Sequence, residues 1–143
     1  MLIKLLEKHF GFNSFLKGQE NVIHKVVEGQ SAAAIFPTGA GKALCYQLPA
    51  LVLPGMTLVV SPLLSLMKDQ LDFLQDNHIP AARLDSTLSK SDYNAILESA
   101  KKGKLKILMI AVERFKNERF RSHLQKMNSS LLVVDEAHCI SEW

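Results

Sequence analysis

Cysteine is scarce in this sequence and long apolar segments are absent, and both facts narrow the class of protein. The two cysteines, Cys45 and Cys139, lie far apart and form no Cys-x-x-Cys pair. This usage predicts a reducing compartment and small buried side chains, with neither a disulfide framework nor a cysteine metal cluster. No apolar run approaches the roughly 20 residues that a membrane-spanning helix needs, and charges interrupt the first turns, residues 1–8. We therefore predict a cytoplasmic protein with no membrane segment and no secretory signal.

The rest of the composition is that of a globular protein with a core. Of the 143 residues, 48% are hydrophobic and 22% are charged, which excludes a disordered chain. The net charge of +3 is compatible with nucleic-acid binding but does not establish it. The sequence has no internal repeat, low-complexity segment or linker, so we predict a single domain.

A glycine-containing loop between a predicted strand, residues 32–36, and a predicted helix that starts at Leu44 organises the chain. This order is the one that phosphate-binding loops need, because backbone N–H groups and a helix N-terminus together hold an anion. Lys42 is expected to reach the β- and γ-phosphates. The residues predicted to contact nucleotide are Pro37, Thr38, Gly39, Ala40, Gly41, Lys42 and Ala43.

The loop meets only half of the pattern G-x-x-x-x-G-K-[ST], so a purely structural glycine turn is the other interpretation. Phe36 occupies the position of the first glycine, and Ala43 that of the Ser or Thr. The missing hydroxyl is the group that usually holds Mg²⁺. We therefore expect nucleotide binding to survive better than hydrolysis.

Two carboxylates follow a second apolar run, residues 131–134, which predicts a strand buried on both faces. Ligands of an open parallel sheet bind at the carboxyl edge of the strands. Asp135 is expected to hold Mg²⁺, and Glu136 to polarise the water that attacks the γ-phosphate. His138 either packs in the protein or links the nucleotide to a neighbouring domain. A solvated acidic turn is the alternative for the whole run.

Strands and helices alternate along the chain, which predicts an α/β fold with a parallel sheet and helices on both faces. Ser61 is predicted as the N-cap of one helix, and Ser89 as the first residue of a capping box. The predicted strands are 32–36, 56–60, 79–84, 105–111 and 131–134, and the predicted helices are 2–9, 19–27, 44–48, 62–76, 90–102 and a charged segment at 112–126.

Three further positions allow either a functional or a structural interpretation. Gln19 follows a group of aromatic residues, and its amide suits the Hoogsteen edge of adenine, although a lone Gln is often simply solvated. The turn at Ser61 can present backbone N–H groups to a nucleic-acid phosphate. Trp143 either stacks on a base or fills a core.

These motifs, in this order, resemble RecQ-type ATP-dependent DNA helicases of superfamily 2. The resemblance covers nearly the whole chain and rests on residues 10–19, 37–50, 60–70 and 135–143, the last of which reads Asp-Glu-Ala-His-Cys-Ile-Ser-Glu-Trp.

The resemblance implies a RecA-like P-loop NTPase domain, truncated, with an adenine-reading motif in residues 1–29 and the part from the glycine loop to the DEAH box in 30–143. It implies ATP and Mg²⁺ as cofactors and single-stranded or 3′-tailed DNA as partner. It further implies 3′-to-5′ unwinding in repair or recombination, in the bacterial cytoplasm or nucleoid. Its site residues are Lys42, Asp135, Glu136 and His138 for catalysis, Asp135 for Mg²⁺, Phe15, Lys17 and Gln19 for the base, and Ser61, Pro62, Leu63, Arg114 and Trp143 for nucleic acid.

The chain departs from the family pattern at Leu16, where an Arg is usual, at Ala43, and at 111–114, where Ala-Val-Glu-Arg replaces Thr-Pro-Glu-Arg. The second motor domain and its arginine finger are expected beyond Trp143. We therefore expect this chain to bind nucleotide and DNA but to hydrolyse ATP poorly by itself. The alternative is an impaired helicase remnant that serves as a nucleic-acid or protein binding module, whereas another P-loop enzyme, such as a small-molecule kinase, is disfavoured.

Overall fold

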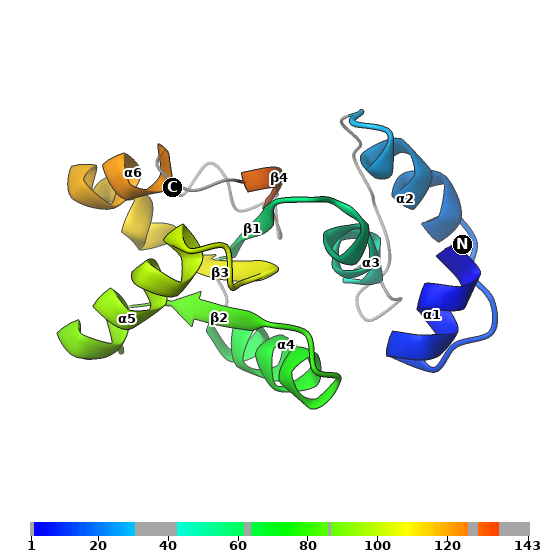
Figure 1. Cartoon of the computed structure of the whole chain (residues 1–143), viewed down its shortest axis with the longest axis horizontal. Helices are drawn as coiled ribbons and strands as arrows, with labels where there is room; N and C mark the ends of the chain where they lie inside the picture. Colours follow the sequence, from blue (N-terminus) through cyan, green and yellow to red (C-terminus); the bar gives the residue numbers. More distant parts are fainter. Residues whose placement is uncertain (1, 31–42, 62–63, 86, 126–128, 135–143) are drawn as a thin grey trace. The chain divides into compact units, whose positions relative to one another are not determined.

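The computed structural model describes residues 2–30, 43–61, 64–85, 87–125 and 129–134. The chain divides into two compact units, Met1–Pro54 and Gly55–Trp143, each of which we describe by itself. Figure 1 labels the α-helices and strands of both units. The arrangement of residues 1–143 as one domain stays a prediction.

The first unit contains three helices, α1 (Leu2–Phe10), α2 (Gln19–Val27) and α3 (Leu44–Val52), and α3 contacts both of the others. All three begin where the sequence predicted. Residues four apart, such as Leu2 and Leu6, form the buried side of α1. Gly29 ends α2 as predicted: it adopts φ 86°, and its N–H donates to the Val26 carbonyl at 3.0 Å.

Helix α3 is buried along most of its length, from Leu44 to Ala50. Cys45 lies in this segment and is 6% exposed. Burial raises the pKa of its thiol to about 11. The interpretation of Cys45 as a small buried side chain is therefore confirmed, whereas Cys139 lies outside the described residues.

The second unit is built on a four-stranded parallel sheet in the order β2-β3-β1-β4 (Figure 1). The strands are β1 (Met56–Ser61), β2 (Ala81–Leu84), β3 (Ile107–Ala111) and β4 (Ser129–Val134). They confirm four of the five predicted strands and their parallel pairing. The strand predicted at residues 32–36 lies outside the described residues.

The helices of this unit are α4 (Leu64–Asp76), α5 (Lys90–Lys101), the 3-10 helix η1 (Val112–Lys116) and α6 (Glu118–Gln125). Both α4 and α5 contact β2. A hydrophobic core joins three strands to α5 and α6. It contains Met56, Leu58, Leu84, Leu97, Ala100, Leu108, Ile110 and Phe120.

The capping signals had different outcomes. Ser89 caps α5 as predicted, because its hydroxyl accepts a hydrogen bond from the Asp92 N–H at 3.1 Å. The prediction that Ser61 caps the next helix stays a prediction, because residues 62–63 lie outside the described part of the chain. Ser61 is the last residue of β1, where it pairs with Ala111, and the structure describes α4 from Leu64 to Asp76.

The charged segment at residues 112–126 does not form one solvated helix as predicted. Asn117 is extended, with φ −92° and ψ 118°, and ends η1. Its side-chain oxygen accepts a hydrogen bond from the Phe120 N–H at 3.2 Å, and α6 begins at the next residue. The preference of Asn for helix caps therefore overrides the continuous charge pattern.

The prediction that β4 is buried on both faces is also wrong. Leu132 is 59% exposed and Val134 is 37% exposed. In the described sheet β4 lies at one end of the strand order and pairs only with β1. An apolar run reports the preference of its side chains for burial, not the number of neighbouring strands.

We predict that Phe120→Ala lowers the free energy of unfolding by about 3–5 kcal/mol, because it leaves a large cavity in the core. Phe120 is 1% exposed. The matched control is Phe73→Ala on α4, where the ring is 38% exposed and the loss should stay below about 1 kcal/mol. Urea unfolding of both variants measures the difference, and equal losses would contradict the assignment of Phe120 to the core.

Candidate functional site

The structure describes six of the predicted site residues, which fall into two groups. Phe15, Lys17, Gln19 and Ala43 belong to the first unit, and Ser61 and Arg114 to the second. The predicted site residues outside the described part are Pro37, Thr38, Gly39, Ala40, Gly41, Lys42, Pro62, Leu63, Asp135, Glu136, His138 and Trp143. Their roles stay predictions.

Gln19 is not a solvated residue at a helix start. Its side chain is 2% exposed, and its Oε1 accepts a hydrogen bond from the Leu16 N–H at 2.7 Å. The Gln19 N–H in turn donates to the Leu16 carbonyl at 3.1 Å. Gly18, at φ 87°, provides the left-handed residue that this turn requires. The two reciprocal bonds fix the direction of the Gln19 amide.

The turn that Gln19 closes exposes apolar surface. Leu16 is 57% exposed and Phe12 is 56% exposed, whereas Phe15 is half-buried and Lys17 is exposed. A planar base can stack on exposed aromatic or apolar side chains of this kind.

Ala43 stands directly before α3 and has helical backbone angles, φ −62° and ψ −33°. Its carbonyl accepts hydrogen bonds from the N–H groups of Tyr46 and Gln47, at 3.2 and 2.9 Å. The start of α3 therefore has the backbone geometry that favours an anion. The methyl side chain of Ala43 has no oxygen for Mg²⁺, so the metal ligand usual at this position is missing.

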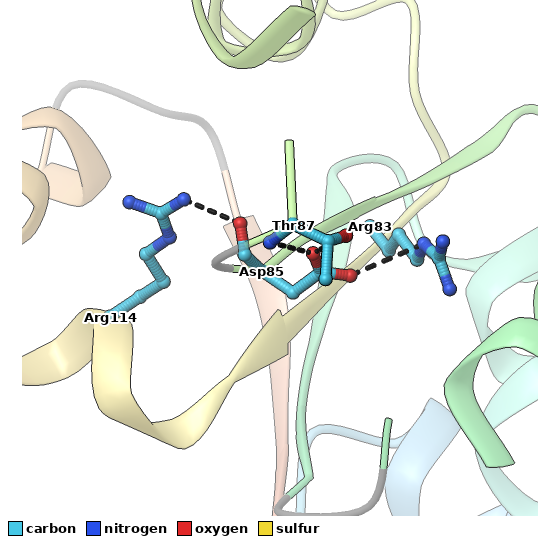
Figure 2. A network of polar contacts seen from close by, with 4 residues as sticks. All are labelled: Arg83, Asp85, Thr87 and Arg114. Atoms are coloured by element: carbon cyan, nitrogen blue, oxygen red, sulfur yellow. Dashed lines mark hydrogen bonds and ion pairs between the residues drawn. The ribbon is translucent and has the colours of Figure 1, made fainter. Parts of the chain in front are cut away.

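The carboxyl ends of the strands define the second group. Ser61 pairs with Ala111, and Leu84 pairs with Ile110, so β1, β2 and β3 end at the same edge. Ser61 is 3% exposed, so its side chain offers little surface to a ligand. A polar network at this edge joins the end of β2 and the residues after it to the turn after β3 (Figure 2).

Asp85, which directly follows β2, is the centre of this network. It is 1% exposed. Its Oδ1 accepts hydrogen bonds from the Thr87 hydroxyl and from the Thr87 N–H, the latter at 2.8 Å. Its Oδ2 lies 3.3 Å from Nε of Arg83. Both carboxylate oxygens are therefore engaged by groups of the same short segment.

Arg114 joins this segment to the turn after β3. Its guanidinium donates a hydrogen bond to the main-chain carbonyl of Asp85, which is 29 residues away in the sequence. The guanidinium carbon also lies 4.7 Å from the ring centroid of Tyr93 on α5. Figure 2 shows Arg114 and Arg83 approaching Asp85 from opposite sides. A carbonyl and an aromatic ring therefore hold the guanidinium of Arg114.

The environment of Asp85 favours the ionised carboxylate. Burial by itself raises the pKa of Asp85. The hydrogen bonds from Thr87 and the positive charges of Arg83 and Arg114 outweigh this effect, and the pKa falls below its ordinary value of 3.8. The carboxylate is therefore charged throughout the neutral range.

Sequence reasoning missed Asp85 and the residues around it. Asp85 follows a strand just as Asp135 does, and its position after the predicted strand at 79–84 was the available signal. No three His, Cys, Asp or Glu side chains gather as metal ligands within the described ranges. Among the helices described above, none has the length and apolar character that crossing a bilayer requires.

Comparison with known proteins supports a helicase domain. Residues 16–143 match the DEAD/DEAH box helicase family. The fold is similar to that of a hypothetical ATP-dependent RNA helicase from Sulfolobus tokodaii, with a TM-score of 0.73 and 21% identity. The similarity covers 99% of this chain and 42% of that one. It confirms the RecA-like α/β fold.

The sequence is also similar to ATP-dependent DNA helicases of the RecQ type. It is 45% identical over 140 residues to RecQ of Bacillus subtilis, covering 97% of this chain and 24% of that protein. It is 46% identical over 143 residues to the Q-like 5 helicase of Arabidopsis thaliana, covering 99% of this chain and 16% of that protein. The chain thus spans a quarter or less of the length of these relatives.

We predict that Asp85→Asn lowers the free energy of unfolding at neutral pH by about 1.5–3 kcal/mol, the usual loss for hydrogen bonds to a charged group. Because the pKa of Asp85 is lowered in the folded state, its contribution is complete above the unfolded-state pKa of about 3.9. It disappears as the pH falls through the folded-state value.

Urea unfolding of both proteins as a function of pH measures this difference. The matched control is Asp72→Asn on the exposed surface of α4, which should change the free energy of unfolding by less than about 0.5 kcal/mol. A difference that persists unchanged into strong acid would show that the charge of Asp85 is not its cause.

Proposed function

The chain belongs to the DEAD/DEAH box helicase family, and on this premise we propose that it is the ATP-binding part of a RecQ-like ATP-dependent DNA helicase. The whole protein then unwinds DNA in the 3′-to-5′ direction, in repair or recombination. The observation that carries the proposal is the family match over residues 16–143, together with 43–46% identity to RecQ-type helicases.

On the nucleotide side, we assign the base to Gln19, Phe15 and Lys17. The exposed side chains of Phe12 and Leu16 in the same turn support this assignment, because a planar base can stack on them. We assign the phosphates of the nucleotide to the loop that ends at Lys42 and to the start of α3.

The catalytic assignments follow the DEAH run. Asp135 would hold Mg²⁺, Glu136 would position the attacking water, and His138 would link the site to a second motor domain. Bound Mg²⁺ would neutralise charge on the β- and γ-phosphates. Because Ala43 has only a methyl side chain, it could not supply the hydroxyl oxygen that usually serves as one ligand of that ion.

On the nucleic-acid side, we assign DNA to the carboxyl edge of the sheet, through the main chain of the turn at Ser61, Pro62 and Leu63 and through Arg114 and Trp143. The parallel register supports this assignment, since it brings the ends of β1 and β3 to one edge. The network around Asp85 gives the same edge a fixed polar surface.

A non-catalytic binding module is the second candidate. Two departures favour it, Leu16 and Ala43, since one alters the base-reading turn and the other removes a metal ligand. Such a module would keep DNA or a partner protein bound without turnover.

We predict that this chain binds ATP but hydrolyses it slowly, with little stimulation by single-stranded DNA. The transition state of phosphoryl transfer gains about 10³–10⁵ in rate from an arginine finger, which the second motor domain would supply. Equilibrium binding of a fluorescent ATP analogue and a phosphate-release assay measure the two properties. Lys42→Ala should abolish nucleotide binding. DNA binding without ATP binding would support the binding module, and robust DNA-stimulated turnover would contradict the predicted incompetence.

We predict that Ala43→Ser tightens Mg²⁺-dependent ATP binding by about tenfold, because the new hydroxyl restores one metal ligand. The gain should vanish when EDTA removes Mg²⁺. The matched control is Ala95→Ser at an exposed position of α5, which should leave the affinity unchanged. If Ala43→Ser leaves the affinity unchanged, metal ligation is not what distinguishes this loop.

A further inference from the structure

A single polar network joins three segments at the carboxyl edge of the sheet. Asp85 begins the segment after β2, Arg114 lies in η1 after β3, and Tyr93 lies in the first turns of α5. Arg114 contacts both Asp85 and Tyr93. Its side chain therefore links the residue that follows β2 to helix α5, and Figure 2 shows the contact with Asp85.

Turn formation alone does not explain why a carboxylate is buried here. A charged group that is 1% exposed loses its hydration, and this loss must be offset by partners. Thr87 and Arg83 together occupy both oxygens of Asp85. A turn at the protein surface needs no such arrangement, since an exposed Asp or Asn forms the same local bond to the residue two positions on.

The position of Arg114 also has an unfavourable free-energy contribution. Its Nε is buried and has no hydrogen-bond partner among the described residues, an arrangement that typically costs about 1–3 kcal/mol. In return, the planar guanidinium is held between a carbonyl and a ring, and one terminal nitrogen is directed away from Asp85 (Figure 2). An arginine held in this way presents its remaining donors in one direction.

We propose that Asp85 is a positioning residue for DNA binding. Through Thr87, Arg83 and the carbonyl that holds Arg114, it fixes the turns after β2 and β3 in the arrangement that receives the sugar–phosphate backbone. Arginines and main-chain N–H groups are among the groups that contact that backbone, and both depend on the geometry of their segment. This inference rests on the proposed function.

The sign of the charge effect separates positioning from simple electrostatics. Asp85→Asn removes a negative charge near a surface that binds a polyanion, so charge alone predicts tighter DNA binding. A positioning role predicts the opposite result, weaker binding. Asp72→Asn makes the same change of charge on the exposed surface of α4 and serves as the control.

The experiment measures the affinity for a fluorescein-labelled oligothymidylate by anisotropy, over a series of salt concentrations. Each variant is first shown to be folded by urea unfolding at the same temperature. We expect Asp85→Asn to bind about tenfold more weakly than the unmodified chain, and Asp72→Asn to bind equally well or slightly more tightly. ATP affinity should not change in either variant.

Arg114→Lys provides a second variant with the charge retained. A lysine keeps the Coulombic attraction but cannot reproduce the planar contact with the Asp85 carbonyl and Tyr93. We expect weaker binding with an unchanged salt slope, whereas loss of a direct phosphate contact would lower that slope by about 0.7 for single strands. If Asp85→Asn does not fold, the DNA affinity and salt slope of Arg114→Lys test the positioning role in its place.

The outcomes distinguish the two proposals. Folded variants that bind DNA as tightly as the unmodified chain would overturn the positioning role while leaving the proposed function intact. An unmodified chain that does not bind single-stranded DNA would overturn the proposed function first.

Discussion

The parallel pairing of β1 with β3 and β4 is the constraint on which the second unit depends. Parallel strands all end at one edge, so each connection must carry the chain back to the opposite edge before the next strand begins. Helices α4, α5 and α6 provide these returns. As a result, the turns after strands that neighbour each other in the sheet lie side by side, separated by about 4.8 Å per strand. The polar groups of this unit meet because of that register.

Apolar packing and polar contacts have separate tasks in this unit. The core around Leu108 and Phe120 holds the helices on the sheet, and it does so without strong directional preference. The network of Asp85 and Arg114 acts instead on the turns beyond the strands, where hydrogen bonds and an aromatic face impose a direction. The edge therefore has a defined shape although little of it belongs to the core.

The sequence predicted what depends on neighbouring residues and missed what depends on distant ones. Apolar runs located four strands, and Ser89 was recognised as a cap because its partner is three residues away. The exposure of Leu132 depends on which strands lie beside β4, which no local pattern reports. The start of α2 at Gln19 was predictable, but the contact between Asp85 and Arg114 spans 29 residues and was not.

Because Cys45 is buried in α3, chemical modification of its thiol can be used to measure local opening of this helix. A thiol that is 6% exposed, with a pKa of about 11, is almost entirely protonated at neutral pH and shielded from alkylating reagents. Alkylation of Cys45 then requires that α3 open, so its rate reports the free energy of that local opening. Because α3 begins directly after Ala43, the rate at which the Cys45 thiol is alkylated reports how often the helix that follows the glycine loop opens.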